Sequence, residues 1–182
     1  GGRIRFLTED EYRRLLQAAR ASRWNMLHVL IKLAVTTGAR KGTLMGLRWG
    51  DLDLTKKQAF VERTKNDEPF VILLQDDVAF ELAKLRGGAL DEHLVFSGRY
   101  PFRPRQFHSA FQAALADAGI EGVVFHTLRH THASWLAQKG VPLLAIAESM
   151  NHKTLAMTKR YAHLCIDSRA QMLRQVFGNG PA

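Results

Sequence analysis

Three histidines and an arginine lie within seven residues of the stretch FHTLRHTHASWLAQKG, residues 125–140. His126 and His130 are four residues apart and share a face of an expected helix, which is a workable spacing for two metal ligands. No glutamate separates them as in a zinc-protease helix, and Arg129 would set a fixed positive charge beside any cation. We therefore disfavour a metal site. We expect His132, which lies away from the shared face, to pack in the core.

A DNA-reading helix is a second interpretation of this stretch, because a basic helix N-terminus can face phosphates or base edges. His126 and Arg129 are only three residues apart and form a compact pair of donors, not a long reading surface. Such a pair suits a single phosphate, so the rest of a phosphate site should be found elsewhere in the chain.

Three other motifs supply groups that a phosphate site needs. TTGAR places Arg40 directly after a helix-ending glycine, and TKN places Lys65 in a hairpin loop. MNHKTLAMTKRYAH supplies His152 and, nine residues on, Tyr161. A phosphodiester under attack gathers negative charge on its equatorial oxygens, which planar guanidinium groups meet well. A phenol with a pKa of about 10 is a poor nucleophile at neutral pH and needs a base or cationic surroundings.

In this order the motifs resemble the tyrosine recombinases, also called phage-type integrases. The set comprises TG-x-R at 37–40, LRW-x-D at 47–51, the hairpin lysine, H-x-L-R-H at 126–130, the histidine at 152 and T-x-x-Y-x-H at 158–163. Each motif alone is weak, whereas six in the right order are strongly specific. The resemblance covers nearly the whole chain and corresponds to the family's catalytic domain.

The resemblance implies a strand exchange in which Tyr161 attacks the scissile phosphate, forming a 3'-phosphotyrosyl link and freeing a 5'-hydroxyl. Arg40 and Arg129 would clamp the non-bridging oxygens of the phosphate. His126 and His152 would act as hydrogen-bond or proton-transfer partners. Without the motif, helical periodicity alone would favour a core role for Tyr161.

Lys65 and His130 have the weakest support within this set. A lysine in a polar turn is ordinarily solvated, and Lys56 and Lys57 leave the alignment of the hairpin open. We prefer Lys65 because TKN heads the loop, and the resemblance implies that it protonates the leaving 5'-oxygen. We expect His130 to support and orient its neighbours without contacting the phosphate directly.

Two residues depart from the family's pattern. Thr43 stands where the family often has a glutamate three residues after the first arginine, so the sequence leaves open whether activity is reduced. Asn151 stands where a glycine usually precedes the third motif's histidine, and asparagine also tolerates unusual backbone angles.

Composition bounds the class of protein. The 182 residues suit one domain, and 26 Lys and Arg against 17 Asp and Glu give a net charge of +9. Such a basic chain suggests a nucleic-acid partner, although composition alone fits a basic solvated surface equally well. The single cysteine excludes an internal disulfide and a cysteine-rich zinc site. No apolar stretch is long enough to cross a bilayer, so we expect a cytoplasmic, DNA-associated protein of a bacterial host.

Periodicity predicts a mainly helical α+β fold with a small three-stranded antiparallel sheet between residues 51 and 74. Thr8 and Glu11 form a capping-box pattern that begins the first helix. Further helices are expected at about 24–38, 41–47, 76–87, 107–118, 128–139, 142–150, 154–164 and 166–177, with a short extended piece at 93–96. We expect a single catalytic domain over 1–182, with 1–5 as a linker remnant and the family's N-terminal DNA-binding domain absent from this chain.

The sequence thus predicts a site-specific recombinase or integrase catalytic domain that cleaves and rejoins DNA without metal, ATP or another cofactor. A type IB topoisomerase-like enzyme, a non-catalytic DNA-binding relative and a metal-dependent nuclease are the alternatives. The expected partners are double-stranded DNA attachment sites, a homotetramer of this protein on DNA, and accessory DNA-bending proteins, with no membrane. The isolated domain is expected to be a monomer, and its last helix to dock on a neighbouring protomer, as in the family.

Overall fold

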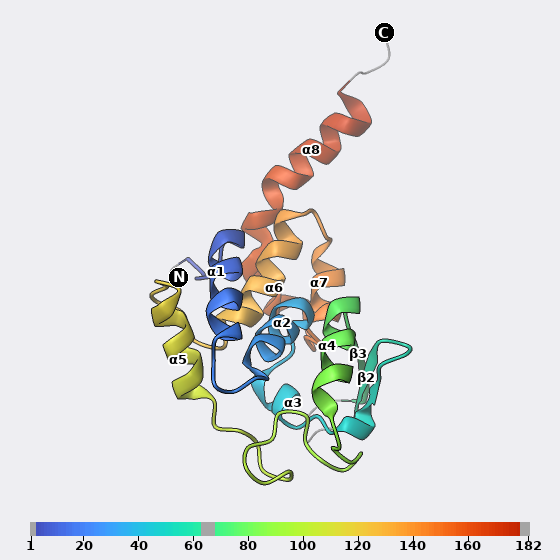
Figure 1. Cartoon of the computed structure of the whole chain (residues 1–182). Helices are drawn as coiled ribbons and strands as arrows, with labels where there is room; N and C mark the ends of the chain where they lie inside the picture. Colours follow the sequence, from blue (N-terminus) through green and yellow to red (C-terminus); the bar gives the residue numbers. More distant parts are fainter. Residues whose placement is uncertain (1–2, 63–67, 179–182) are drawn as a thin grey trace.

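The computed structural model of the chain describes residues 3–62 and 68–178. Its helices and strands follow one another as α1 (Glu9–Arg20), α2 (Leu27–Thr37), α3 (Lys41–Met45), η1 (Trp49–Asp51), β1 (Leu52–Asp53), β2 (Gln58–Val61), β3 (Phe70–Leu73), α4 (Asp76–Arg86), α5 (His108–Asp117), α6 (Thr127–Gln138), α7 (Leu143–Ser149), η2 (Leu155–Met157), η3 (Lys159–Cys165) and α8 (Ile166–Phe177). The predicted mainly helical α+β class is confirmed. The helices gather around α2 and α6, whereas α8 projects away from the body (Figure 1).

Helix α2 forms the centre of the core because most of its side chains are apolar and buried. Its buried residues are Leu27, Val29, Leu30, Ile31, Leu33, Ala34, Val35 and Thr37. A helix with so wide an apolar surface is stable when neighbours cover it, and α1, α4 and α6 pack against it. Helix α1 begins as predicted at the Thr8 capping box, in which the Thr8 hydroxyl accepts from the Glu11 N–H and the Glu11 carboxylate accepts from the Thr8 N–H.

The predicted sheet is present, with strand order β1-β2-β3 and antiparallel pairing throughout. Ala59 of β2 pairs with Ile72 of β3, and both are buried against the helices. The next pair, Phe60 and Val71, points outward and is about half exposed. This alternation is the period-2 pattern of a sheet that covers a core with one face. Lys65 belongs to residues 63–67, between β2 and β3, and lies outside the described residues.

The predicted helix at 154–164 is wrong in type. The segment forms two 3-10 helices, η2 and η3, which meet at Thr158. A 3-10 helix has three residues per turn, so residues three apart lie directly above one another. Thr158 and Tyr161 therefore share one face, and they are 0% and 1% exposed.

Two smaller predictions also differ from the structure. Helix α2 begins at Leu27, three residues later than expected from the pattern at Trp24. The extended piece expected at 93–96 is reduced to isolated bridges that pair Arg48 with Leu94 and Ser97 with Pro104. Among the described residues, no helix has the length and apolarity needed to span a membrane.

Gly38 ends α2 in the left-handed conformation, with a φ of +68°. A Cβ built at this position would lie 2.5 Å from Cδ2 of His132. We expect Gly38→Ala to reduce the free energy of unfolding by about 2 kcal/mol or more, because alanine is strained there and also clashes with a buried ring.

Gly42, within α3, provides the matched control, since a Cβ there meets nothing within 4 Å. Gly42→Ala should leave stability unchanged or raise it by up to about 1 kcal/mol, as for any helical glycine. Urea unfolding of both variants measures the difference. Equal midpoints for the two would show that the left-handed turn does not constrain this site.

Candidate active site

One cavity of about 370 Å³ brings together residues from five segments of the chain. Its wall is formed by Arg40, His126, Arg129, His130, His152, Ala156, Met157, Arg160 and Tyr161. Five of the six predicted catalytic residues therefore meet, together with His130. The sixth, Lys65, lies outside the described residues and stays a prediction. Of the described residues that line this cavity, none is a carboxylate, so the wall is suited to an anion.

The two predicted phosphate-binding arginines are held in different ways. Arg40 follows the turn at Gly38 in extended conformation, just before α3, and its side chain is half-buried. Arg129 lies in the first turn of α6 and is only 5% exposed. Its guanidinium donates from Nη1 to the carbonyl of Gly38 and from Nη2 to the carbonyl of Met150, at 3.0 Å for the second bond. Arg129 thus ties the end of α2 and the end of α7 to α6.

The hydroxyl of Tyr161 lies 2.7 Å from Nδ1 of His130. The tyrosine ring sits in a small apolar cluster beneath α6, with Ala133, Ile146 and Met150 among its neighbours. Burial raises the pKa of Tyr161, and the positive charge of Arg160 opposes that rise. His130 therefore touches the predicted nucleophile itself, a contact that spacing along α6 did not predict.

His152 is oriented by the threonine of the T-x-x-Y motif. Its Nδ1 lies 2.7 Å from Oγ1 of the fully buried Thr158. Burial, together with the positive charges of Arg129 and Arg40, lowers the pKa of His152 to about 4. The neutral imidazole can then present its other nitrogen to the cavity, where it can donate or accept a hydrogen bond.

His126 precedes α6 and is exposed at the mouth of the cavity. Its ring meets that of His130 edge to face, with 4.7 Å between the centroids. Burial and the charge of Arg129 lower the pKa of His126 as well. Burial is the main cause of the lowered pKa of both His126 and His130, and the charges of Arg129 and Arg160 add to it.

His132 is the one histidine of the stretch that faces the core, as predicted. It is 7% exposed, its Nδ1 lies 2.8 Å from the carbonyl of Val35, and its Nε2 lies 2.7 Å from Oγ of Ser149. A carbonyl can only accept, so Nδ1 carries the proton and Nε2 accepts from the serine hydroxyl. His132 therefore fastens α6 to α2 and α7.

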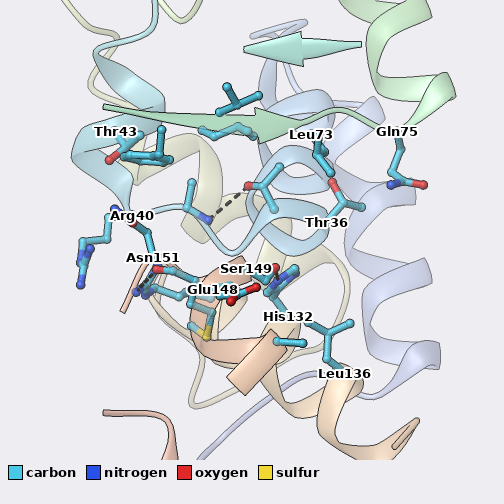
Figure 2. A pocket seen from close by; sticks show the side chains of 18 residues that line it. Thr36, Arg40, Thr43, Leu73, Gln75, His132, Leu136, Glu148, Ser149 and Asn151 are labelled. Carbon is cyan, nitrogen blue, oxygen red and sulfur yellow. Dashed lines mark hydrogen bonds between the residues drawn. The ribbon is translucent and has the colours of Figure 1, made fainter. Parts of the chain in front are cut away.

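The two departures from the family's pattern line one cavity. Asn151 adopts a φ of +53°, so asparagine fills a left-handed position for which a glycine would also serve. Thr43 lines a neighbouring cavity of about 450 Å³ together with Arg40, Glu148 and Asn151. Figure 2 shows Arg40 and Thr43 at one end of this cavity and Gln75 at the other.

The sequence reasoning missed two residues of the site. Thr158 orients His152, and Arg160 lines the cavity with its guanidinium carbon 6.0 Å from the centre of the Tyr161 ring. The spacing of three between Thr158 and Tyr161 was the available signal, because it places both on one face if the segment is a 3-10 helix.

Acid should destabilise this protein through the cavity histidines. The folded-state pKa of His130 and of His152 falls to about 4 from 6.5, so the unfolded chain takes up protons first as the pH falls. The stabilisation that these two histidines contribute is fully present above about pH 6.5 and is lost as the pH falls to about 4. The carboxylates contribute at lower pH, because the pKa of Glu11, for example, is lowered from 4.5 to about 2.

We expect the midpoint of urea unfolding to fall between about pH 7 and pH 5, and to fall less in a His130→Gln, His152→Gln double variant. A midpoint that stays constant over this range in the unaltered protein would contradict the burial of neutral histidines.

The described residues contain no group of three or more His, Cys, Asp or Glu side chains arranged to hold a metal ion. The cavity histidines instead share the wall with three arginines, Arg40, Arg129 and Arg160, which repel a cation. The chemistry of this donor set therefore suits a phosphate.

The sequence profile described as the phage integrase family matches residues 5–166. The integrase of Salmonella phage P22 is 32% identical over 187 residues, covering 96% of this chain and 47% of that protein. The chain spans about half the length of the curated relatives it matches.

Two solved structures establish the fold. The catalytic domain of bacteriophage HP1 integrase matches with a TM-score of 0.70 and 24% identity, covering 94% of this chain and 96% of that one. XerH site-specific recombinase bound to palindromic difH substrate, a post-cleavage complex, matches with a TM-score of 0.76 and 20% identity, covering 95% of this chain and 53% of that one. The chain belongs to the phage integrase family and has the fold of a tyrosine recombinase catalytic domain.

Proposed function

We propose that this chain is the catalytic domain of a site-specific DNA recombinase, which cuts and rejoins DNA through a covalent 3'-phosphotyrosine. One observation carries the proposal: Arg40, Arg129, His126 and His152 line a single cavity together with Tyr161. A phosphodiester in that cavity would meet a nucleophile, two guanidinium groups and two imidazoles at once.

The first step is attack by the Tyr161 oxygen on phosphorus. Negative charge then builds on the two non-bridging oxygens, where Arg40 and Arg129 stabilise it by paired hydrogen bonds. Arg129 is already fixed by the carbonyls of Gly38 and Met150, so little reorganisation is needed as the charge develops. His126 and His152 add hydrogen bonds to the same oxygens or transfer protons.

The leaving group is the 5'-oxygen of the next nucleotide, which must gain a proton. We assign that proton to Lys65, on the loop between β2 and β3. The phosphotyrosine keeps the energy of the phosphodiester, so attack by a 5'-hydroxyl on the same phosphorus rejoins the strand without ATP. The cationic side chains supply the charge stabilisation that bound metal ions supply in other nucleases, so we propose a metal-independent reaction.

Double-stranded DNA is the proposed substrate. The net charge of +9 and the cationic cavity both favour a polyanion, and a Tn1549 transposon integrase of the same fold is described as in complex with a circular intermediate DNA. The proposed setting is the cytoplasm of a bacterial host, with residues 1–182 acting as one catalytic domain.

A nicked suicide substrate in EDTA tests this function. On such DNA the short strand beyond the cleavage site diffuses away, so rejoining fails and the protein–DNA adduct accumulates. We expect an adduct in EDTA that resists boiling in detergent. Cleavage that EDTA stops would favour a metal-dependent nuclease, and DNA binding without any cleavage would favour a non-catalytic relative.

Strand exchange must be separated from a topoisomerase-like reaction, which shares the cleavage step. Two attachment-site plasmids of different length should yield recombinant joints if the protein is a recombinase. Relaxation of supercoils without joints would support the type IB topoisomerase alternative.

We also propose that a tetramer assembles on DNA through α8. None of the described residues of this helix is buried, and Met172, Leu173, Val176 and Phe177 are each at least half exposed. Figure 1 shows the helix extending away from the body. An apolar stripe of this kind is stable when another protomer covers it. Gel filtration on DNA with α8 deleted tests the proposal, and unchanged assembly would overturn it. Accessory DNA-bending proteins remain further proposed partners.

A further inference from the structure

The hydroxyl of Tyr161 lies 2.7 Å from Nδ1 of His130, its hydrogen-bond partner among the described residues. Tyr161 as a whole is 1% exposed, so most of the residue is shielded from bulk solvent. His130 lies one helical turn after His126 and lines the same cavity. The imidazole thus contacts the predicted nucleophile from within the predicted phosphate site.

We propose that His130 is a catalytic residue, namely the base that accepts the proton of Tyr161 during DNA cleavage. The inference rests on the proposed function. As the phenolic oxygen bonds to phosphorus, its O–H bond breaks and the proton moves to Nδ1, while the bond from phosphorus to the 5'-oxygen breaks. The leaving oxygen takes its proton from a separate acid. Rejoining reverses the step, with the imidazolium of His130 returning the proton to the phenolate.

The hydrogen bond runs in the required direction. A neutral imidazole has one donor nitrogen and one acceptor nitrogen. If Nδ1 donated, the proton of the buried Tyr161 hydroxyl would be left without the acceptor that the structure provides. If the hydroxyl donates to Nδ1, both groups are satisfied, and His130 carries its own proton on Nε2.

The surrounding charges keep His130 neutral and ready to accept a proton. Arg129 faces it from α6, His126 from the residue before α6, and Arg160 from η3; Arg40 and His152 complete the cavity wall. Burial and these positive groups lower the pKa of His130 to about 4. An entering phosphodiester brings a negative charge that offsets the arginines, so the imidazole becomes a stronger base when DNA is bound.

The other two cavity histidines are placed for other tasks. Nδ1 of His152 is engaged by Oγ1 of Thr158, so only its second nitrogen is available to the phosphate. His126 lies at the exposed mouth, where it can reach a phosphate oxygen. The geometry therefore gives the histidines different roles: His130 contacts the nucleophile, and His126 and His152 are placed to contact the phosphate.

The deciding variant is His130→Asn, since the amide oxygen can accept the bond from Tyr161 but cannot take its proton. We expect the single-turnover rate of adduct formation on the nicked substrate to fall by about 10²–10⁴-fold, with DNA affinity unchanged. The rate of the variant should still be rising with pH at about pH 9, because only the ionised phenol then reacts and burial raises the pKa of Tyr161 from its ordinary value of about 10. His108→Asn, at the exposed start of α5, is the matched control and should keep the full rate.

A substrate with sulfur as the bridging 5'-atom separates the two ends of the reaction, because a thiolate leaves without a proton. We expect this substrate to restore the cleavage rate of the Lys65→Ala variant but not that of the His130→Asn variant. If His130→Asn folds poorly, His130→Gln with the same substrate gives the same comparison.

An unaltered rate in His130→Asn, or rescue of that variant by the sulfur substrate, would overturn the assignment of His130. Absence of any adduct in the unaltered protein would instead count against the proposed function as a whole.

Discussion

Tyr161→Phe is expected to eliminate the covalent adduct, with a loss of cleavage on the order of 10⁴-fold or more. The ring still fills the apolar cluster between α6, α7 and η3, so packing is retained. Only the hydroxyl and its bond to His130 are lost, which costs about 1 kcal/mol of stability. DNA affinity should be unchanged, because the positive groups of the cavity remain.

The chain contains three tyrosines, which provides matched controls. Tyr12 packs against Trp135 near α1, and Tyr100 is 56% exposed in the loop before α5. Neither lines the cavity. Tyr12→Phe and Tyr100→Phe should therefore form the adduct at the normal rate. Loss of the adduct in either control, with Tyr161→Phe active, would move the nucleophile elsewhere.

Arg129→Lys is expected to disturb both chemistry and folding. The lysine keeps the charge but cannot form the planar pair of bonds to a phosphate, so cleavage should fall by about 10²–10³-fold. The lysine also cannot donate hydrogen bonds to the carbonyls of Gly38 and Met150 at the same time. We expect unfolding to become easier by about 2 kcal/mol.

Arg40→Lys separates these two effects. Arg40 is half-buried at the edge of the cavity, so the same substitution should leave stability within about 0.5 kcal/mol of the unaltered protein. Cleavage should again fall by about 10²–10³-fold. Urea unfolding and single-turnover cleavage, measured on both variants, give the comparison. Equal stability of the two variants would show that the carbonyl contacts of Arg129 do not hold the site together.

Much of the fold could be predicted because local chemistry decides it. The capping box at Thr8, the glycine at 38 and the period-2 pattern of β2 and β3 each have a direct physical cause within a few residues. The 3-10 winding of η3 has no such local cause. It depends on Thr158 meeting His152 and on Tyr161 reaching beneath α6, and these are tertiary contacts.

The site, too, could be predicted in part: its residues could be identified from the sequence, but their contacts could not. The order of the motifs predicted which residues meet in the cavity, because the chemistry needs those residue types whatever the backbone between them. It did not predict how they touch. His130 was expected to support its neighbours, and its contact with Tyr161 depends on the rotation of α6 relative to η3. The role of Lys65 stays a prediction, since it lies outside the described residues.

The central claim is a covalent bond between DNA and Tyr161, and peptide mapping of the trapped adduct tests it most directly. The adduct formed in EDTA would be digested with trypsin and nuclease and analysed by mass spectrometry. We expect a nucleotide attached through its 3'-phosphate to Tyr161, in the peptide YAHLCIDSR, residues 161–169. A nucleotide on any other residue, or cleaved DNA ends with no attached peptide, would contradict it.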